Sequence, residues 1–218
     1  MGLLDTIFPR QCPCGAWDVA ACEACLEAVG PPTDVSSFLP HLLGVRVWTL
    51  ADYAGPAGGL IRAWKSRPQG ELDRIMSRAI TPRASALTEL PELGELPARL
   101  AVVPAPSGPG RYRSGTFIAG VIADAVAAGV AGRPGAQRTI SAELFHPRPG
   151  HQVGRDKSER ARRRRIRLAA RCADPILLVD DVATTGATMS ACARALERDH
   201  DVIGALTVAA VVRHSALS

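Results

Sequence analysis

Short apolar runs alternate with helical patterns over most of the chain after residue 45. The runs with the length and composition of strands are 45–50, 100–103, 176–179 and 202–212. Apolar residues recur at helical intervals over 60–80, interrupted at 67–70, and the sequence also predicts helices over 117–128 and 188–198. Buried strands that alternate with helices predict an α/β fold with a doubly wound, mostly parallel sheet.

A Gly-Pro-Pro break at 30–32 separates an N-terminal segment from this pattern. The sequence therefore predicts a small module at 1–30 and an α/β domain at 31–218. With 218 residues, of which 47% are apolar and 22% charged, the chain has the composition of an ordinary globular protein and enough length for a buried core.

The sequence predicts neither a membrane span nor an export signal. The longest apolar candidate, 117–130, is broken by Gly120, Asp124 and Gly129, and falls short of the roughly 18 residues that a span needs. The N-terminal segment carries Asp5 where a signal peptide has positive charge. We therefore expect a cytoplasmic protein.

Positive charge is concentrated in one segment. The chain has 26 Lys/Arg and 21 Asp/Glu, for a net charge of +5. Residues 151–171 hold nine Lys/Arg and two acids, a net +7, which leaves the rest of the chain at −2. Such a segment attracts partners that carry phosphate, either a small anion or a nucleic acid.

Four of the six cysteines lie close together near the N-terminus, at Cys12, Cys14, Cys22 and Cys25. In a reducing compartment, clustered thiols bind a metal more often than they form disulfides. Two cysteine knuckles supply four thiolates, which suit a closed, structural Zn²⁺ site in a zinc-ribbon-like module. Because the first knuckle has one intervening residue instead of two to four, the sequence leaves open a ribbon without metal.

The stretch 176–188, Ile-Leu-Leu-Val-Asp-Asp-Val-Ala-Thr-Thr-Gly-Ala-Thr, carries the most specific chemistry. An apolar strand leads into two acids and a turn of small residues that opens a helix, which is where open α/β sheets bind ligands. Backbone N–H groups and threonine hydroxyls at a helix start bind phosphate. Adjacent carboxylates would repel phosphate alone, but they accept hydrogen bonds from a vicinal diol. The pattern therefore indicates a site for a phosphorylated ribose.

All thirteen positions of this stretch are similar to the phosphoribosyl-pyrophosphate (PRPP) motif of type I phosphoribosyltransferases. Nearly the whole chain resembles the ComF family of competence-associated, phosphoribosyltransferase-like proteins. Besides the cysteine knuckles and the PRPP motif, the features that carry this resemblance are Tyr53-Ala-Gly-Pro56 with Leu60-Ile-Arg-Ala-Trp-Lys65, Val103-Pro-Ala-Pro106, and Gln152-Val-Gly154 with Arg160. The resemblance implies a type I phosphoribosyltransferase fold behind the N-terminal module.

The resemblance also implies a role for each matching segment. The ribose hydroxyls would be held by Asp180 and Asp181, the 5′-phosphate by Thr184, Thr185, Gly186, Ala187 and Thr188, and the pyrophosphate by Val103, Pro104, Ala105 and Pro106. Residues 152–164 would form a lid, on which Arg155, Lys157 and Arg160 would act as catalytic cations that neutralise the leaving pyrophosphate. Mg²⁺ would enter with PRPP, since it is a hard ion that prefers oxygen ligands.

The leading prediction is therefore a phosphoribosyltransferase-like protein that binds PRPP with Mg²⁺ and transfers ribose 5-phosphate to a nucleophile. Two other functions stay open. One is a non-catalytic protein of DNA uptake or recombination, in which arginines spaced along 160–171 bind single-stranded DNA. The other is a sensor that binds PRPP without turning it over. For the basic segment itself, a solvated helix face is an equally good interpretation.

Overall fold

The computed structural model describes residues 11–66, 70–107, 117–146 and 166–212. Its centre is a six-stranded sheet in the order β1-β2-β6-β5-β3-β4. The strands are β1 (Thr33–Asp34), β2 (Val47–Thr49), β3 (Arg99–Pro104), β4 (Arg138–Ser141), β5 (Ile176–Ala183) and β6 (Val202–Ala210). All neighbours pair in parallel except β1 and β2. The predicted α/β fold with a mostly parallel sheet is confirmed.

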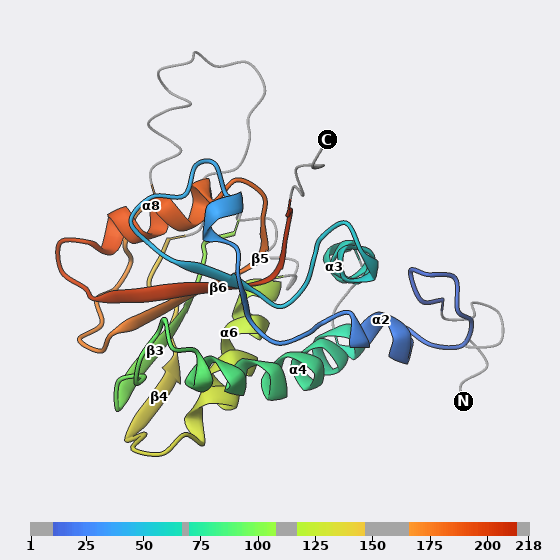
Figure 1. Ribbon diagram of the computed structural model, residues 1–218, viewed down its shortest axis with the longest axis horizontal. Coiled ribbons are helices and arrows are strands. Elements are labelled where there is room, and N and C mark those ends of the chain that lie inside the picture. The colour runs from blue at the N-terminus through green and yellow to red at the C-terminus, as the bar shows by residue number, and fades with distance from the viewer. Residues whose placement is uncertain (1–10, 67–69, 108–116, 147–165, 213–218) are drawn as a thin grey trace, which may run out of the picture.

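Helices cover both faces of this sheet (Figure 1). The described α-helices are α2 (Glu23–Glu27), α3 (Pro56–Ser66), α4 (Glu71–Ala84), α6 (Ile118–Ala131) and α8 (Ala187–Leu196), joined by the 3₁₀ helices η1 (Ser36–Phe38) and η2 (Ser85–Glu89). Helix α8 lies on one face, and α4 and α6 lie on the other (Figure 1). These helices are all too short or too polar to traverse a bilayer.

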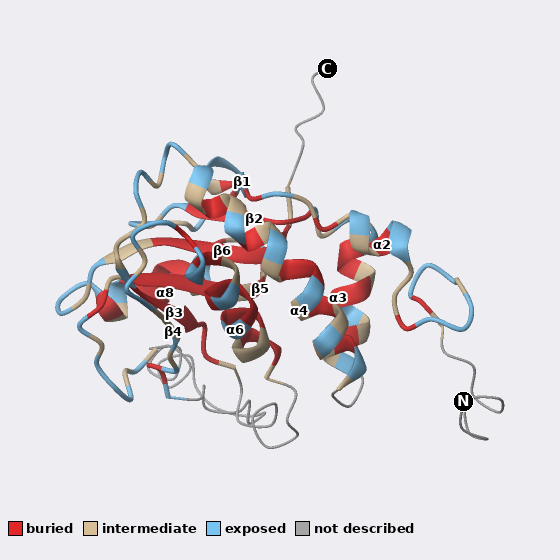
Figure 2. Ribbon diagram, turned by 90° about the horizontal axis from the view of Figure 1, so that it is seen from below, coloured by how far each residue is buried: buried red, intermediate tan, exposed pale blue. Residues whose placement is uncertain are grey.

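The central strands are buried on both sides, as their continuous apolar sequences predict. Figure 2 shows the buried sheet between helices whose outer faces are exposed. Along β5, Leu177 and Val179 pack in the cluster that includes α3, α4 and α6, whereas Ile176 and Leu178 pack in the cluster that includes α8. The alternation does not continue to the end of the strand, because Val182 packs in the first of these clusters and Ala183 in the second.

Strand β5 is longer than the sequence predicts. The apolar pattern ends at Val179, but pairing with β6 continues through Asp180↔Thr207 to Ala183↔Ala210, so both acids lie within the strand. Strands β1 and β4 were not predicted, because Thr33–Asp34 and Arg138–Ser141 lack an apolar run. Both lie at sheet edges, where one neighbouring strand supplies the backbone partners.

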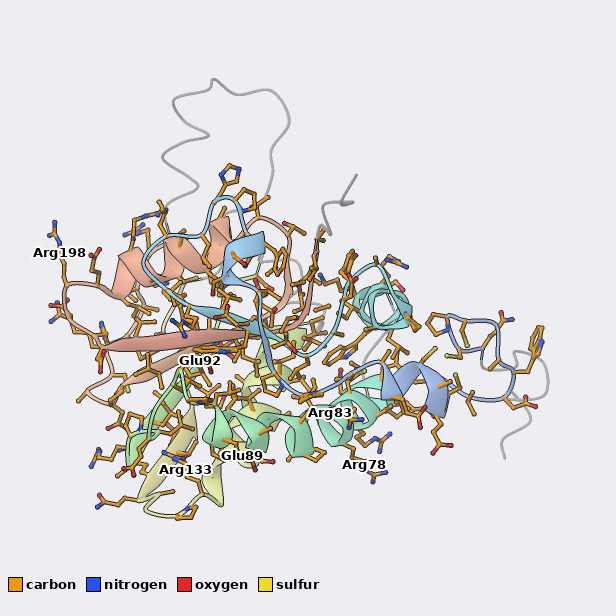
Figure 3. All side chains as sticks on the ribbon, in the orientation of Figure 1. Arg78, Arg83, Glu89, Glu92, Arg133 and Arg198 are labelled. Atoms are coloured by element: carbon orange, nitrogen blue, oxygen red, sulfur yellow. The ribbon has the colours of Figure 1, made fainter. Side chains whose placement is uncertain are left out.

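One buried arginine ties the end of α6 to the edge of the sheet. Arg133 donates hydrogen bonds of 2.7 Å to the Val130 carbonyl and to Thr139 Oγ1, and a further one to the Pro97 carbonyl (Figure 3). Burial lowers the pKa of its guanidinium. The neutral acceptors around it indicate that Arg133 fixes the connection between α6 and β4.

Replacing Gly129 with alanine is expected to destabilise the protein by about 2 kcal/mol. A Cβ at this position would lie 2.3 Å from the Thr81 carbonyl oxygen and 3.0 Å from Ala84 Cβ, so α4 and α6 would have to separate. The gain in helix propensity, about 1 kcal/mol, offsets part of this cost. Urea denaturation measures the difference.

Gly120 is the matched control in the same helix. Its added Cβ would approach only the Phe117 side chain, at 2.9 Å, and a side chain can move where backbone cannot. We expect Gly120→Ala to stay within about 1 kcal/mol of the wild type. Equal unfolding free energies for the two variants would contradict the close helix contact at Gly129.

Candidate functional site

The candidate site lies where β5 turns into α8. Residues Thr184 and Thr185 follow the strand, and Gly186 caps the helix with φ +78°. That left-handed conformation suits glycine, and an added Cβ would also lie 2.8 Å from Leu42 Cβ. The N–H groups of a helix's first turn have no acceptors within the helix. The start of α8 therefore directs these N–H donors and the positive end of the helix dipole toward the same point in front of the helix.

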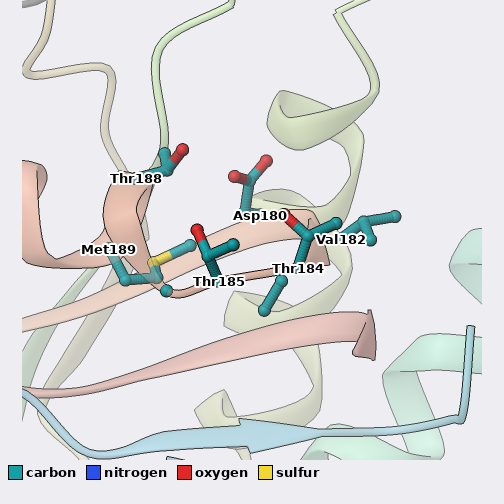
Figure 4. Close-up of a pocket in the computed structure, with 8 residues that line it drawn as sticks. Asp180, Val182, Thr184, Thr185, Thr188 and Met189 are labelled. Atoms are coloured by element: carbon teal, nitrogen blue, oxygen red, sulfur yellow. The ribbon is translucent and has the colours of Figure 1, made fainter. Parts of the chain in front are cut away.

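A small hollow, open to solvent, lies at this turn. It is lined by Asp180, Val182, Ala183, Thr184, Thr185, Gly186, Thr188 and Met189. Figure 4 shows the Asp180 carboxylate and the hydroxyls of Thr185 and Thr188 pointing to the same side. The hollow thus combines hydroxyl donors, a helix start and one carboxylate, a set that can bind a phosphate and a neighbouring hydroxyl group of one ligand.

The two acids of the motif have different surroundings. Asp180 is half-buried and lines the hollow, and its Oδ1 accepts a hydrogen bond of 2.9 Å from the Asp181 backbone N–H. Asp181 is buried, and its Oδ1 lies 2.8 Å from Lys65 Nζ on α3. The structure therefore brings both acids to the site and pairs Asp181 with Lys65.

The segment Val103–Pro106 ends beside the acid pair. Pro104 lies opposite Val179 in the parallel pairing of β3 with β5, and the Ala105 N–H donates to the Val179 carbonyl at 2.7 Å. All four residues of the segment are buried. The structure thus places the segment next to the strand that carries Asp180.

The turn between β5 and α8 is hydrogen-bonded to segment 41–43, a contact that the sequence did not indicate. The His41 N–H donates to the Thr185 carbonyl at 2.8 Å, and the buried Ser190 hydroxyl donates to the His41 carbonyl at 2.9 Å. The same hydroxyl accepts a hydrogen bond of 2.7 Å from the Leu43 N–H. No sequence signal reveals this contact, because the partners are more than 140 residues apart.

The three predicted catalytic cations, Arg155, Lys157 and Arg160, lie outside the described residues, as does the whole predicted lid at 152–164. Of the basic segment, the structure describes only 166–171. There Arg171 pairs with Asp199 at 3.3 Å on the surface.

A second cluster is formed by the four N-terminal cysteines. One Sγ atom each from Cys12, Cys14, Cys22 and Cys25 lies within 4.8 Å of all the others. The Cys14 and Cys22 sulfurs are 3.4 Å apart, and those of Cys12 and Cys22 are 3.7 Å apart. All four are free thiols. The predicted convergence of the two knuckles is confirmed, and the cluster could bind a metal.

Two of the thiols have pKa values shifted in opposite directions. Hydrogen bonds from the Ala16 backbone and then from the neighbouring thiols lower the pKa of Cys14 to about 7. Burial, followed by the neighbouring sulfurs, raises the pKa of Cys25. The Cys22 N–H donates to Cys12 Sγ at 3.3 Å.

Comparison with known proteins adds no assignment to this geometry. No family model matches the chain, and no curated protein is significantly similar to it.

Proposed function

We propose that the hollow at the β5–α8 turn binds the ribose 5-phosphate part of PRPP, and that the chain acts as a phosphoribosyltransferase of type I. The observation that carries this proposal is the hollow itself, in which a carboxylate and threonine hydroxyls flank the start of a helix at the carboxyl end of a central parallel strand. The 5′-phosphate would lie in the turn at 184–188, and Asp180 would accept hydrogen bonds from the ribose hydroxyls.

In the proposed reaction, a nitrogen nucleophile forms a bond to ribose C1 while the bond from C1 to the pyrophosphate oxygen breaks. Negative charge develops on the departing pyrophosphate. Arg155, Lys157 and Arg160 would neutralise that charge. Segment 103–106, beside β5, would contact the pyrophosphate from the other side of the ribose. Mg²⁺ would enter with PRPP, bound to the oxygens of its diphosphate and hydroxyls, and would neutralise the diphosphate.

Calorimetric titration with ribose 5-phosphate and with PRPP, each with Mg²⁺, tests the proposal. We expect binding of both, and at least a tenfold weaker affinity in Asp180→Asn because the ribose hydroxyls lose a charged acceptor. Asp124→Asn removes an exposed carboxylate from α6, away from the hollow, and should bind as the wild type does. A wild-type protein that binds neither ligand would overturn the proposal.

A pyrophosphate-release assay with a panel of nucleobases then separates transfer from sensing. Release that depends on a nucleobase supports the transferase, whereas PRPP binding without release under any acceptor supports a sensor. Salt-dependent binding of single-stranded DNA in place of PRPP would favour the DNA-uptake function.

We also propose that the cysteine cluster holds one structural Zn²⁺. In a tetrahedral site with Zn–S bonds of about 2.3 Å, neighbouring sulfurs lie about 3.8 Å apart. The sulfur separations of 3.4 and 3.7 Å are close to that value. Four cysteine ligands leave no open position, so the metal would stabilise the module and take no part in phosphoribosyl chemistry.

A further inference from the structure

Lys65 reaches the acid pair from an element that the PRPP motif does not include. Its Nζ lies 2.8 Å from Asp181 Oδ1, and the two side chains are 25% and 10% exposed. The preceding residue, Trp64, is buried and donates a hydrogen bond from its indole to Asp73 on α4. Lys65 therefore projects from the last turn of a helix whose end is itself held in place.

The two acids lie on opposite sides of β5. Successive residues of a strand point to opposite faces, and the contacts of each acid show on which face it lies. Leu177 and Val179 pack on the side of α3, so Asp181 continues that row toward Lys65. Asp180, the adjacent residue, points away from Lys65 and lines the hollow at the start of α8.

The ion pair of Lys65 with Asp181 reduces the electrostatic repulsion that the proposed anionic ligand would meet at the acid pair. Two neighbouring carboxylates would both repel a phosphorylated sugar, and a partly buried charge is screened less than an exposed one. The Lys65 ammonium cancels the charge of Asp181. The ligand then meets the carboxylate of Asp180 without the added repulsion of a second carboxylate at Asp181.

We propose that Lys65 is a positioning residue of the ligand site: it holds Asp181 on the α3 side of β5 and neutralises it, so that an anionic ribose phosphate can bind beside Asp180. This inference rests on the proposed function. It predicts that a lysine on a helix more than 100 residues before the motif controls the affinity for the phosphorylated ribose.

The test measures ribose 5-phosphate affinity by calorimetry at low and high salt. Lys65→Met should weaken binding at least tenfold at low salt, and the loss should shrink only in part at high salt, because the charge of the buried Asp181 is screened less than an exposed one. Lys65→Arg keeps the charge and should bind within about threefold of the wild type. In the double variant Lys65→Met/Asp181→Asn no uncompensated charge remains at Asp181, and most of the lost affinity should return.

Arg62→Met is the matched control. Arg62 is an exposed cation on the same helix, stacked 5.5 Å over the Tyr53 ring and not among the residues that line the hollow. Its loss should change affinity by about twofold or less, since an exposed charge is strongly screened. Urea unfolding of each variant verifies that the protein is folded.

The outcomes separate this inference from the function on which it rests. If the wild type does not bind ribose 5-phosphate, the proposed function fails and the inference fails with it. If the wild type binds and Lys65→Met binds equally well, only the inference is overturned. It is overturned as well if the double variant binds no better than Lys65→Met, because then Lys65 acts through something other than the charge of Asp181.

Discussion

Gly186→Ala is expected to abolish measurable ribose 5-phosphate binding and to lower the free energy of unfolding by about 3 kcal/mol. Two costs add at this residue. Its φ of +78° is unfavourable for any side chain, and the new Cβ would lie 2.8 Å from Leu42 Cβ and 3.1 Å from Leu39 Cβ. Segment 39–43 is hydrogen-bonded to Thr185 and Ser190, so it cannot move away without disturbing the turn.

Gly135→Ala separates the cost of a left-handed backbone conformation from the cost of the steric contact. Gly135 has a φ of +76° but no atom within 4 Å of an added Cβ, so only the conformational cost, about 1 kcal/mol, should appear. Gly135 does not line the hollow, and its variant should bind ribose 5-phosphate normally. Urea denaturation and calorimetry on both variants provide the comparison. If Gly186→Ala were as stable as Gly135→Ala and still bound ligand, the turn would not depend on its contact with Leu42.

The sequence predicted the parts of the fold in which local pattern and burial agree. Continuous apolar residues at 100–103 and 176–179 become strands buried on both faces, because no polar group has to be accommodated there. The predicted end of this strand at Val179 was wrong, because β5 continues through polar residues to Ala183. Asp180 and Asp181 are poor strand formers, and only pairing with the apolar end of β6, invisible in the local sequence, keeps them extended.

In the candidate sites, too, the local features were predicted from the sequence and the long-range contacts were not. The spacing of the cysteines predicted their convergence, since each knuckle is a local turn. The motif at 180–188 predicted a polar turn before a helix, which the structure has. Its partners could not be predicted, because the contacts of Lys65 with Asp181 and of Ser190 with segment 41–43 join residues more than 100 positions apart. Such contacts depend on how α3 and the segment before β2 pack on the sheet.

Removal of the proposed Zn²⁺ is expected to unfold the cysteine module. Zinc binding to four such ligands contributes on the order of 10 kcal/mol in small zinc domains. Cys12 and Cys25 are both 2% exposed, and the described part of the module contains one helix of five residues, α2, so little else holds residues 11–29 together. Metal analysis should find one Zn²⁺ per chain, and strong chelation should remove it.

Cysteine variants provide the specific test. Cys14→Ser removes one ligand and should reduce zinc content to near zero, because three thiolates bind the ion far more weakly. Cys172→Ser removes a thiol outside the cluster and should keep the full zinc content. Full zinc content in Cys14→Ser, or none in the wild type grown with ample zinc, would contradict the site.

The effect of zinc loss should extend from the module into α3. Cys12, Cys25 and Val29 belong to the same hydrophobic cluster as Leu60 and Ile61 of α3, and a Cβ at Gly59 would lie 3.2 Å from Pro13 Cβ. Hydrogen exchange should therefore speed up in residues 11–29 and, by a smaller factor, in α3, while β5 and β6 stay protected in the centre of the sheet. Because α3 carries Lys65, chelation should also weaken ribose 5-phosphate binding. Unchanged exchange in α3 after complete zinc removal would show that the module and the ligand site are independent.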